Sequence, residues 1–155
     1  MATTLHSRPF IHVERSLPQK ICMTMGWALV ILGVLGFMAP GFLGMHLSVA
    51  HSTLQLFFGV LSLIFGLSEK SGPAYTFSWI FGAFYVLLGI AGFFFGTTGF
   101  PTVGNLLHEE RFLWSIAPNV LEFAANDHII HILIGAIFWL PALWWRAQQI
   151  PKQPG

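Results

Sequence analysis

The sequence predicts an all-α fold: an integral membrane four-helix bundle made of two parallel-repeat helical hairpins, with an amphipathic outer loop between the third and fourth helices. Of the 155 residues, 55% are hydrophobic and only 8% are charged, whereas soluble domains carry roughly a quarter charged residues. Four apolar runs without Asp, Glu, Lys or Arg are each close to the roughly 17–25 residues that a spanning helix needs. They cover residues 21–39, 47–67, 75–95 and 128–145.

The basic residues predict the orientation of these four spans. Six of the seven fall on the side that holds both chain ends, and only Arg111 falls opposite; the six are Arg8, Arg15, Lys20, Lys70, Arg146 and Lys152. The positive-inside rule makes their side cytoplasmic. We therefore expect a multi-pass protein of the inner (plasma) membrane, with a cytoplasmic segment at 1–20, a transmembrane domain at 21–147 and a cytoplasmic tail at 148–155. The first run is longer than the apolar region of a signal peptide and is expected to be retained.

The connections between the spans differ in kind. Two are short, at 40–46 and 68–74, whereas the third, 96–127, is long for a compact bundle and is a candidate functional segment. Its residues 105–115 mix apolar and charged side chains as an interfacial helix does. Asn119 to Glu122 has the cap chemistry of one or two further helical turns, and Asp127 is placed to cap the fourth helix.

An internal repeat relates the two halves of the chain. Gly26, Gly33 and Gly36 match Gly82, Gly89 and Gly92 at a constant offset within two similar twelve-residue segments, 26–37 and 82–93. The second and fourth helices match more weakly when Gly59 is aligned with Gly135, which pairs Ser52 with His128 and Gln55 with His131. Both halves begin on the same side, so the hairpins are expected to be related by an axis along the membrane normal.

Small residues on the predicted helices indicate close packing, because membrane helices approach each other at such faces. Ser48, Ser52, Gln55, Gly59, Ser62 and Gly66 recur at spacings of three and four, on one face of the second helix. Glycines predicted to serve packing are Gly33, Gly36, Gly59, Gly89, Gly92 and Gly135. Among them, Gly59 and Gly135 are expected to let the second helix approach the fourth.

Five of the seven histidines fall on the outer side, and His51, His128 and His131 lie within the spans at similar depth. Ionisable groups inside a membrane span indicate function. In one interpretation they bond to backbone carbonyls, to Gln55 or to Asp127 and hold the second helix against the fourth. In another they bind copper or zinc, and Asp127 and Gln55 orient the ligating imidazoles. In a third they ligate a haem or a chlorin, and proton or quinone chemistry is also open.

Other classes of function lack their sequence signatures. The net charge of +1 argues against nucleic acid, and Cys22 is the only cysteine. No catalytic residue set and no phosphate-binding loop is visible, so we expect a non-enzymatic protein. The interpretation that follows is a structural or accessory subunit, in contact with the lipid bilayer and with other subunits of a larger membrane complex. The alternative is a metal- or tetrapyrrole-binding membrane protein that uses the outer histidines.

Two motifs resemble an uncharacterised family of small bacterial membrane proteins with four spans, domain of unknown function 4383. One is Pro118-Asn-x-Leu-Glu-Phe123 followed by Asp127-His128-Ile-Ile-His131-Ile-Leu-Ile-Gly135, which is similar to the family's pattern at the start of its last helix. The other is Leu88-Gly-x-x-Gly-Phe93. The resemblance covers the second to fourth helices. It implies the four-helix architecture and a role for His131, but no activity.

Overall fold

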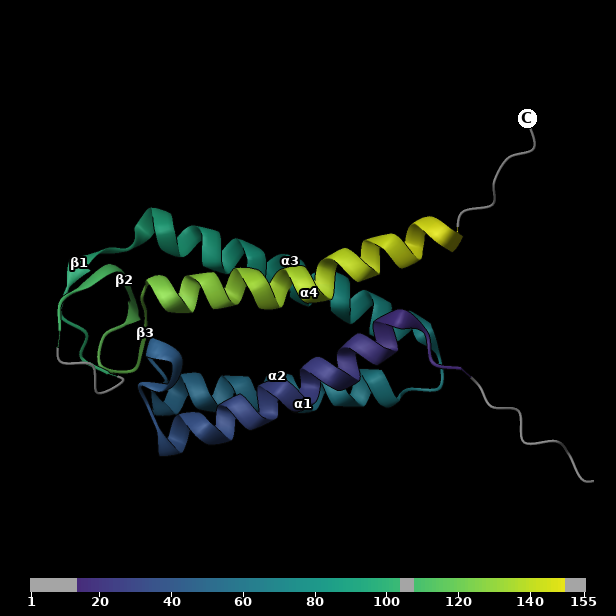
Figure 1. The fold of residues 1–155 in the computed structure, drawn as a ribbon, viewed down its shortest axis with the longest axis horizontal. Helices are drawn as coiled ribbons and strands as arrows, with labels where there is room; N and C mark the ends of the chain where they lie inside the picture. Colours follow the sequence, from purple (N-terminus) through teal and green to yellow (C-terminus); the bar gives the residue numbers. More distant parts are fainter. Residues whose placement is uncertain (1–13, 104–107, 150–155) are drawn as a thin grey trace, which may run out of the picture.

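Four long helices form the body of the protein in the computed structural model, which describes residues 14–103 and 108–149 (Figure 1). They are α1 (Leu17–Met38), α2 (Val49–Leu67), α3 (Ser71–Phe95) and α4 (Ala125–Gln149). Each is long and apolar enough to cross a membrane. The predicted set of four spans is therefore confirmed, and the chain is a multi-pass membrane protein. The outermost parts of the predicted terminal segments, 1–13 and 150–155, lie outside the described residues.

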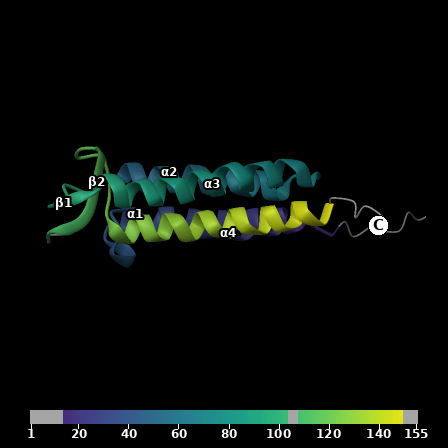
Figure 2. The same ribbon diagram turned by 90° about the horizontal axis from the view of Figure 1, so that it is seen from above.

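The helices are paired as two hairpins, α1 with α2 and α3 with α4, which lie side by side with the start of α1 and the end of α4 at one end of the bundle (Figures 1 and 2). Between the hairpins lies a core in which aromatic side chains predominate. Phe81 packs on Tyr85 and Phe138, with ring centroids 4.3 and 5.0 Å apart, and Leu29 of α1 completes this cluster. Apolar burial thus holds the hairpins together in the middle of the bundle.

Glycines bring the two helices of each hairpin into backbone contact. A Cβ atom at Gly59 would lie 2.9 Å from the carbonyl oxygen of Gly26 in α1, and one at Gly135 would lie 2.6 Å from that of Gly82 in α3. The remaining predicted packing glycines also face the partner helix of their own hairpin: Gly33 and Gly36 face α2, and Gly89 and Gly92 face α4. The expectation that Gly59 and Gly135 join α2 to α4 is therefore wrong, because both glycines serve contacts inside a hairpin.

Polar residues lie beyond the apolar runs at the end of the bundle where α1 begins and α2 ends. The backbone N–H of Ser16 donates to the side chain of Gln19 at 2.9 Å, and α1 begins at Leu17, before the predicted apolar run that starts at residue 21. Gln19 donates in turn to the carbonyl oxygen of Ser68 at 2.6 Å, and Arg15 donates to that of Gly66 at 2.8 Å. These two bonds satisfy carbonyls at the end of α2, which the helix itself leaves without partners.

A small antiparallel sheet covers the opposite end, with strands in the order β1 (Thr97–Gly99), β2 (Glu110–Ala117) and β3 (Leu121–Phe123). The interfacial helix predicted at 105–115 is therefore wrong over its described part; residues 105–107 lie outside the described residues. Phe, Trp and Ile in β2 favour a strand, and this strand gains partners on both sides.

The turn between β2 and β3 overturns the helical turns predicted from Asn119 to Glu122. Pro118 stands at the second turn position, and Asn119 at the third has φ 64°, in the left-handed region. The N–H of Val120 donates to the carbonyl oxygen of Ala117 at 3.0 Å, which closes the turn. Proline followed by asparagine with positive φ is typical of a type II turn. A short 3-10 helix, η1 (Phe42–Gly44), lies between α1 and α2.

Candidate functional site

Six polar side chains are buried together where the sheet meets the bundle, and we call them the sheet-end cluster. None is more than 3% exposed: they are His46, His51, Gln55, Asp127, His128 and His131. Buried polar groups in lipid or protein are costly unless they are hydrogen-bonded. The partners of each group therefore show what the cluster does.

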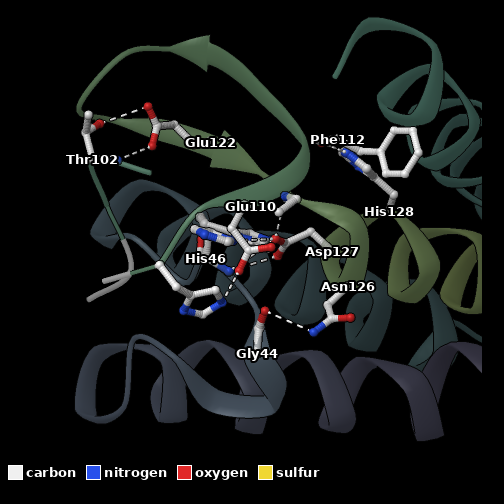
Figure 3. Close-up of polar contacts among 12 residues, drawn as sticks. Gly44, His46, Thr102, Glu110, Phe112, Glu122, Asn126, Asp127 and His128 are labelled. Carbon is white, nitrogen blue, oxygen red and sulfur yellow. Dashed lines mark hydrogen bonds and ion pairs between the residues drawn. The ribbon is translucent and has the colours of Figure 1, made fainter. Parts of the chain in front are cut away.

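Asp127 joins the start of α4 to the segment before α2 (Figure 3). Its carboxylate accepts from the backbone N–H of Ala124 at 2.9 Å, which satisfies a donor at the beginning of the helix. It also accepts from the backbone N–H of His46 at 3.2 Å and from the His46 ring Nδ1 at 3.1 Å. Asp127 is thus both a helix-capping group and a partner that fixes an imidazole, the two roles considered for it. His46 was among the outer histidines, but sequence reasoning did not select it.

His51, in the first turn of α2, is held by two bonds. Its Nδ1 lies 2.9 Å from the carbonyl oxygen of His46, so Nδ1 carries the proton and donates. Its Nε2 lies 3.3 Å from the amide nitrogen of Gln55 and accepts from it. These partners assign the neutral tautomer with the proton on Nδ1. Gln55, predicted as a supporting residue, therefore fixes the ring orientation of His51.

His128 points toward α3 and β2. Its Nε2 donates to the carbonyl oxygen of Phe112 at 2.8 Å (Figure 3), and its ring lies against Gly92 of α3, where it occupies the space that a Cβ would take. Phe112 has φ 57°, a strained conformation for a bulky residue, and it brings this carbonyl into the contact. His128 thus joins α4 to the sheet and to α3.

His131 lies beside His51, and both rings line a small cavity. The two ring centroids are 5.7 Å apart, and the His131 ring meets Tyr85 and Phe123 edge to face at 5.2 and 4.9 Å. The cavity has a volume of about 210 Å³; aromatic and imidazole rings and four aliphatic side chains line it. Among the residues that the structure describes, Nδ1 of His131 has no hydrogen-bond partner, and neither has Oε1 of Gln55.

The three histidines proposed as ligands are therefore not equivalent. The structure brings His51 and His131 together, whereas His128 is bonded elsewhere. Within residues 14–103 and 108–149, no three side chains of His, Cys, Asp or Glu are placed to hold one metal ion. Both ring nitrogens of His51 already have partners, so metal binding by this pair requires Gln55 to move.

Glu122 forms a second buried polar group inside the sheet and was missed as a site residue. Its carboxylate accepts from the backbone N–H and the hydroxyl of Thr102 at 2.7 and 2.8 Å (Figure 3), and from the hydroxyl of Ser115 at 2.9 Å. Burial raises the pKa of Glu122, but the bonds from Thr102, Ser115 and Val103 outweigh it and hold this pKa below its usual range. The ionised carboxylate thus holds the connection between β1 and β2 to strand β3.

Comparison of the chain with protein-family models, with curated proteins and with solved structures finds no match in any of the three. The function is therefore inferred from the geometry of the sheet-end cluster and from the helix surfaces.

Proposed function

We propose that this membrane protein is a non-enzymatic accessory subunit that packs beside a larger membrane complex. The bonding of the sheet-end cluster supports this function. Asp127, His46 and His51 bond to one another, to backbone groups and to Gln55, so the ionisable groups join the hairpins rather than face a reactant. Polar side chains between membrane helices commonly have this structural role.

The outer faces of the helices support a role among lipids and other subunits. Each helix exposes large apolar side chains, represented by Ile31, Ile64, Leu87 and Leu133, which are 56%, 58%, 65% and 56% exposed. Such surfaces are stable against lipid or against another membrane helix. We propose that one of these four faces contacts a partner subunit.

A photo-crosslinking amino acid at each of the four positions tests this proposal in native membranes. We expect crosslinks to one protein, in stoichiometric amount, from one or two adjacent faces, and lipid adducts from the rest. The same amino acid at Phe138, which is fully buried, is the control and should give no intermolecular product. Lipid adducts from all four faces would contradict the accessory role.

The alternative function, binding of a metal or a tetrapyrrole by His51, His128 and His131, has weaker support. His128 is bonded to the sheet, and the cavity of about 210 Å³ that His51 and His131 line is smaller than the roughly 300–1,000 Å³ of pockets for larger ligands. Visible absorbance or stoichiometric copper or zinc in the purified protein, lost in His131→Ala, would establish the alternative and refute the purely structural role.

We further propose that the protein lies in the inner (plasma) membrane, with the sheet on the outer side. The basic residues Arg15, Lys20, Lys70 and Arg146 collect at the other end of the bundle, and such residues favour the cytoplasmic side. Cysteine at Ser115 should react with an impermeant thiol reagent in intact cells, and cysteine at Ser71 should not. The reverse labelling would place the sheet inside.

The internal repeat and the family resemblance belong to the same proposal. Equivalent glycines make equivalent contacts in the two hairpins: Gly26 with Gly59, and Gly82 with Gly135. This correspondence supports a duplicated hairpin related by an axis along the membrane normal. The similarity of the Asp127 to Gly135 segment to domain of unknown function 4383 supports a common four-helix architecture.

A further inference from the structure

We propose that the cavity lined by His51 and His131 binds the ring of a neutral amphiphile, a lipid of the isoprenoid quinone class, whose apolar chain lies in a groove between α2 and α3. This binding site requires no partner subunit and is independent of the accessory role. It uses His131, a member of the sheet-end cluster that lines the cavity and whose Nδ1 has no hydrogen-bond partner among the described residues.

A long apolar groove adjoins the cavity. The groove has a volume of about 690 Å³, and every side chain that lines it is apolar except Thr76. Phe58 of α2 and Phe84 of α3 line both the groove and the cavity, so the two spaces meet at these rings. From Phe84 the groove extends along α3 to Pro73, a span of about 16 Å at the helical rise per residue. An extended hydrocarbon chain fits this shape.

The cavity carries polar groups that suit a carbonyl or a hydroxyl. His131 is 3% exposed and lines the cavity, and its Nδ1 has no partner among the described residues. A buried group of this kind gains a hydrogen bond from a ligand at little further cost in desolvation. Neutral imidazole both donates and accepts, so His131 suits a ring carbonyl in one tautomer and a ring hydroxyl in the other.

The cavity walls select the kind of head group. Phe58, Phe84, Tyr85 and Phe123 surround the space with ring faces and edges, against which a flat ring stacks. None of the lining side chains is a Lys or an Arg, so the phosphate of a phospholipid would be buried without a counter-charge. A partner helix, about 10 Å across, fits along an open groove but does not enter the cavity. A lipid with a neutral ring and one apolar chain fits both, with the ring in the cavity and the chain in the groove.

Binding of a decyl-substituted benzoquinone to the purified full chain in mild detergent tests this inference, with benzoquinone lacking the chain as the comparison ligand. His131→Phe keeps a ring and removes its hydrogen-bonding nitrogens; we expect Kd to rise about fivefold, as for one lost hydrogen bond. His128→Phe is its control in the same helix and should leave Kd unchanged, because His128 does not line the cavity.

Ile80→Trp tests the groove. Ile80 lines it and is 59% exposed, so the larger ring fills the groove without disturbing the core. We expect the decyl compound to lose at least about tenfold in affinity, since burying each methylene contributes ~0.8 kcal/mol. Leu87→Trp, on the same helix at 65% exposure and outside the groove, is the control. Melting temperatures without ligand verify that each variant is folded.

Equal affinities in wild type, His131→Phe and Ile80→Trp would show unspecific partitioning of the quinone and overturn the proposal. A second outcome also overturns it: Ile80→Trp removes a co-purifying membrane protein and leaves quinone affinity unchanged, which assigns the groove to a partner helix. Weaker binding of the decyl compound in both variants, with unchanged binding in both controls, supports the site.

Discussion

Replacing Asp127 with alanine removes the acceptor that joins the start of α4 to the segment before α2. Three donors then lose their partner: the backbone N–H of Ala124, the backbone N–H of His46 and the His46 ring Nδ1–H. Asp127 and His46 are fully buried, so water has no ready access to these donors. The substitution therefore tests whether the sheet-end cluster stabilises the fold.

The expected loss follows from these three bonds. An unsatisfied buried donor costs about 1–3 kcal/mol, so three such donors together set a loss of at least about 3 kcal/mol. We expect Asp127→Ala to lower the free energy of unfolding by about 3–5 kcal/mol, toward the lower value if the bundle end relaxes. Asp127→Asn keeps one carbonyl oxygen and should lose about half as much. Asn126→Ala removes one exposed bond, 3.3 Å to Gly44, and should cost less than ~1 kcal/mol.

Unfolding in mixed detergent, followed by tryptophan fluorescence, measures these differences, and hydrogen exchange locates them. The amides of His46 and Ala124 should exchange faster in Asp127→Ala than in Asn126→Ala, whereas amides in the middle of α1 should change only with global stability. A loss below ~1 kcal/mol with unchanged exchange at His46 and Ala124 would refute the reasoning, because the three donors would then have other partners.

Three further predictions concern the hairpins and the sheet. Gly59→Leu and Gly135→Leu should each lower the thermal stability in detergent, by about 1–3 kcal/mol, because the new side chain meets backbone atoms of α1 or α3; wild-type stability of both would mean that these glycines face lipid. Gly92→Ala should be more costly than Gly36→Ala in the same unfolding assay, since the first meets the bonded His128 ring and the second meets the hydroxyl of Ser52, which can rotate; equal costs would contradict this. The fold lowers the pKa of Glu122, so its carboxylate stabilises the protein above the unfolded-state pKa and loses this effect as pH falls through the folded-state pKa. Glu122→Gln should therefore flatten the acid part of the curve of unfolding free energy against pH. A variant curve parallel to that of the wild type would refute this prediction.

The four helices were predictable because the information is local. Each apolar run is long and uncharged, which alone specifies a spanning helix. The sheet was not predictable in this way. Residues 108–115 are short and mixed in polarity, so their pattern fits an interfacial helix as well as a strand. The strand forms because β1 and β3 supply backbone partners from elsewhere in the chain, and a turn at Pro118 and Asn119 reverses its direction.

The candidate site was predicted in part. Topology alone places His51, His131 and Asp127 at one end of the bundle, and the structure shows them there. The separation of His128 from His131 depends on rotation about α4, because residues three apart point about 60° from each other. His131 faces the cavity, whereas His128 bonds to the carbonyl of Phe112, whose positive φ has no sequence signal. His46 lies before α2, in a segment without periodicity.

The proposed duplication explains why the polar groups meet where they do. With Gly59 aligned to Gly135, His51 is equivalent to Asp127, and Cys22 is likewise equivalent to Ser78 in the offset that relates α1 to α3. Both pairs are in contact: His51 Nδ1 lies 3.9 Å from Asp127, and Cys22 Sγ lies 3.2 Å from the Ser78 hydroxyl. Equivalent residues meet only near the axis that relates two repeats. In a dimer of identical hairpins such a position would face its own copy, and two buried carboxylates in contact repel each other. Fusion of the hairpins into one chain permits a histidine opposite an aspartate, a pair that a symmetric dimer cannot form at its axis.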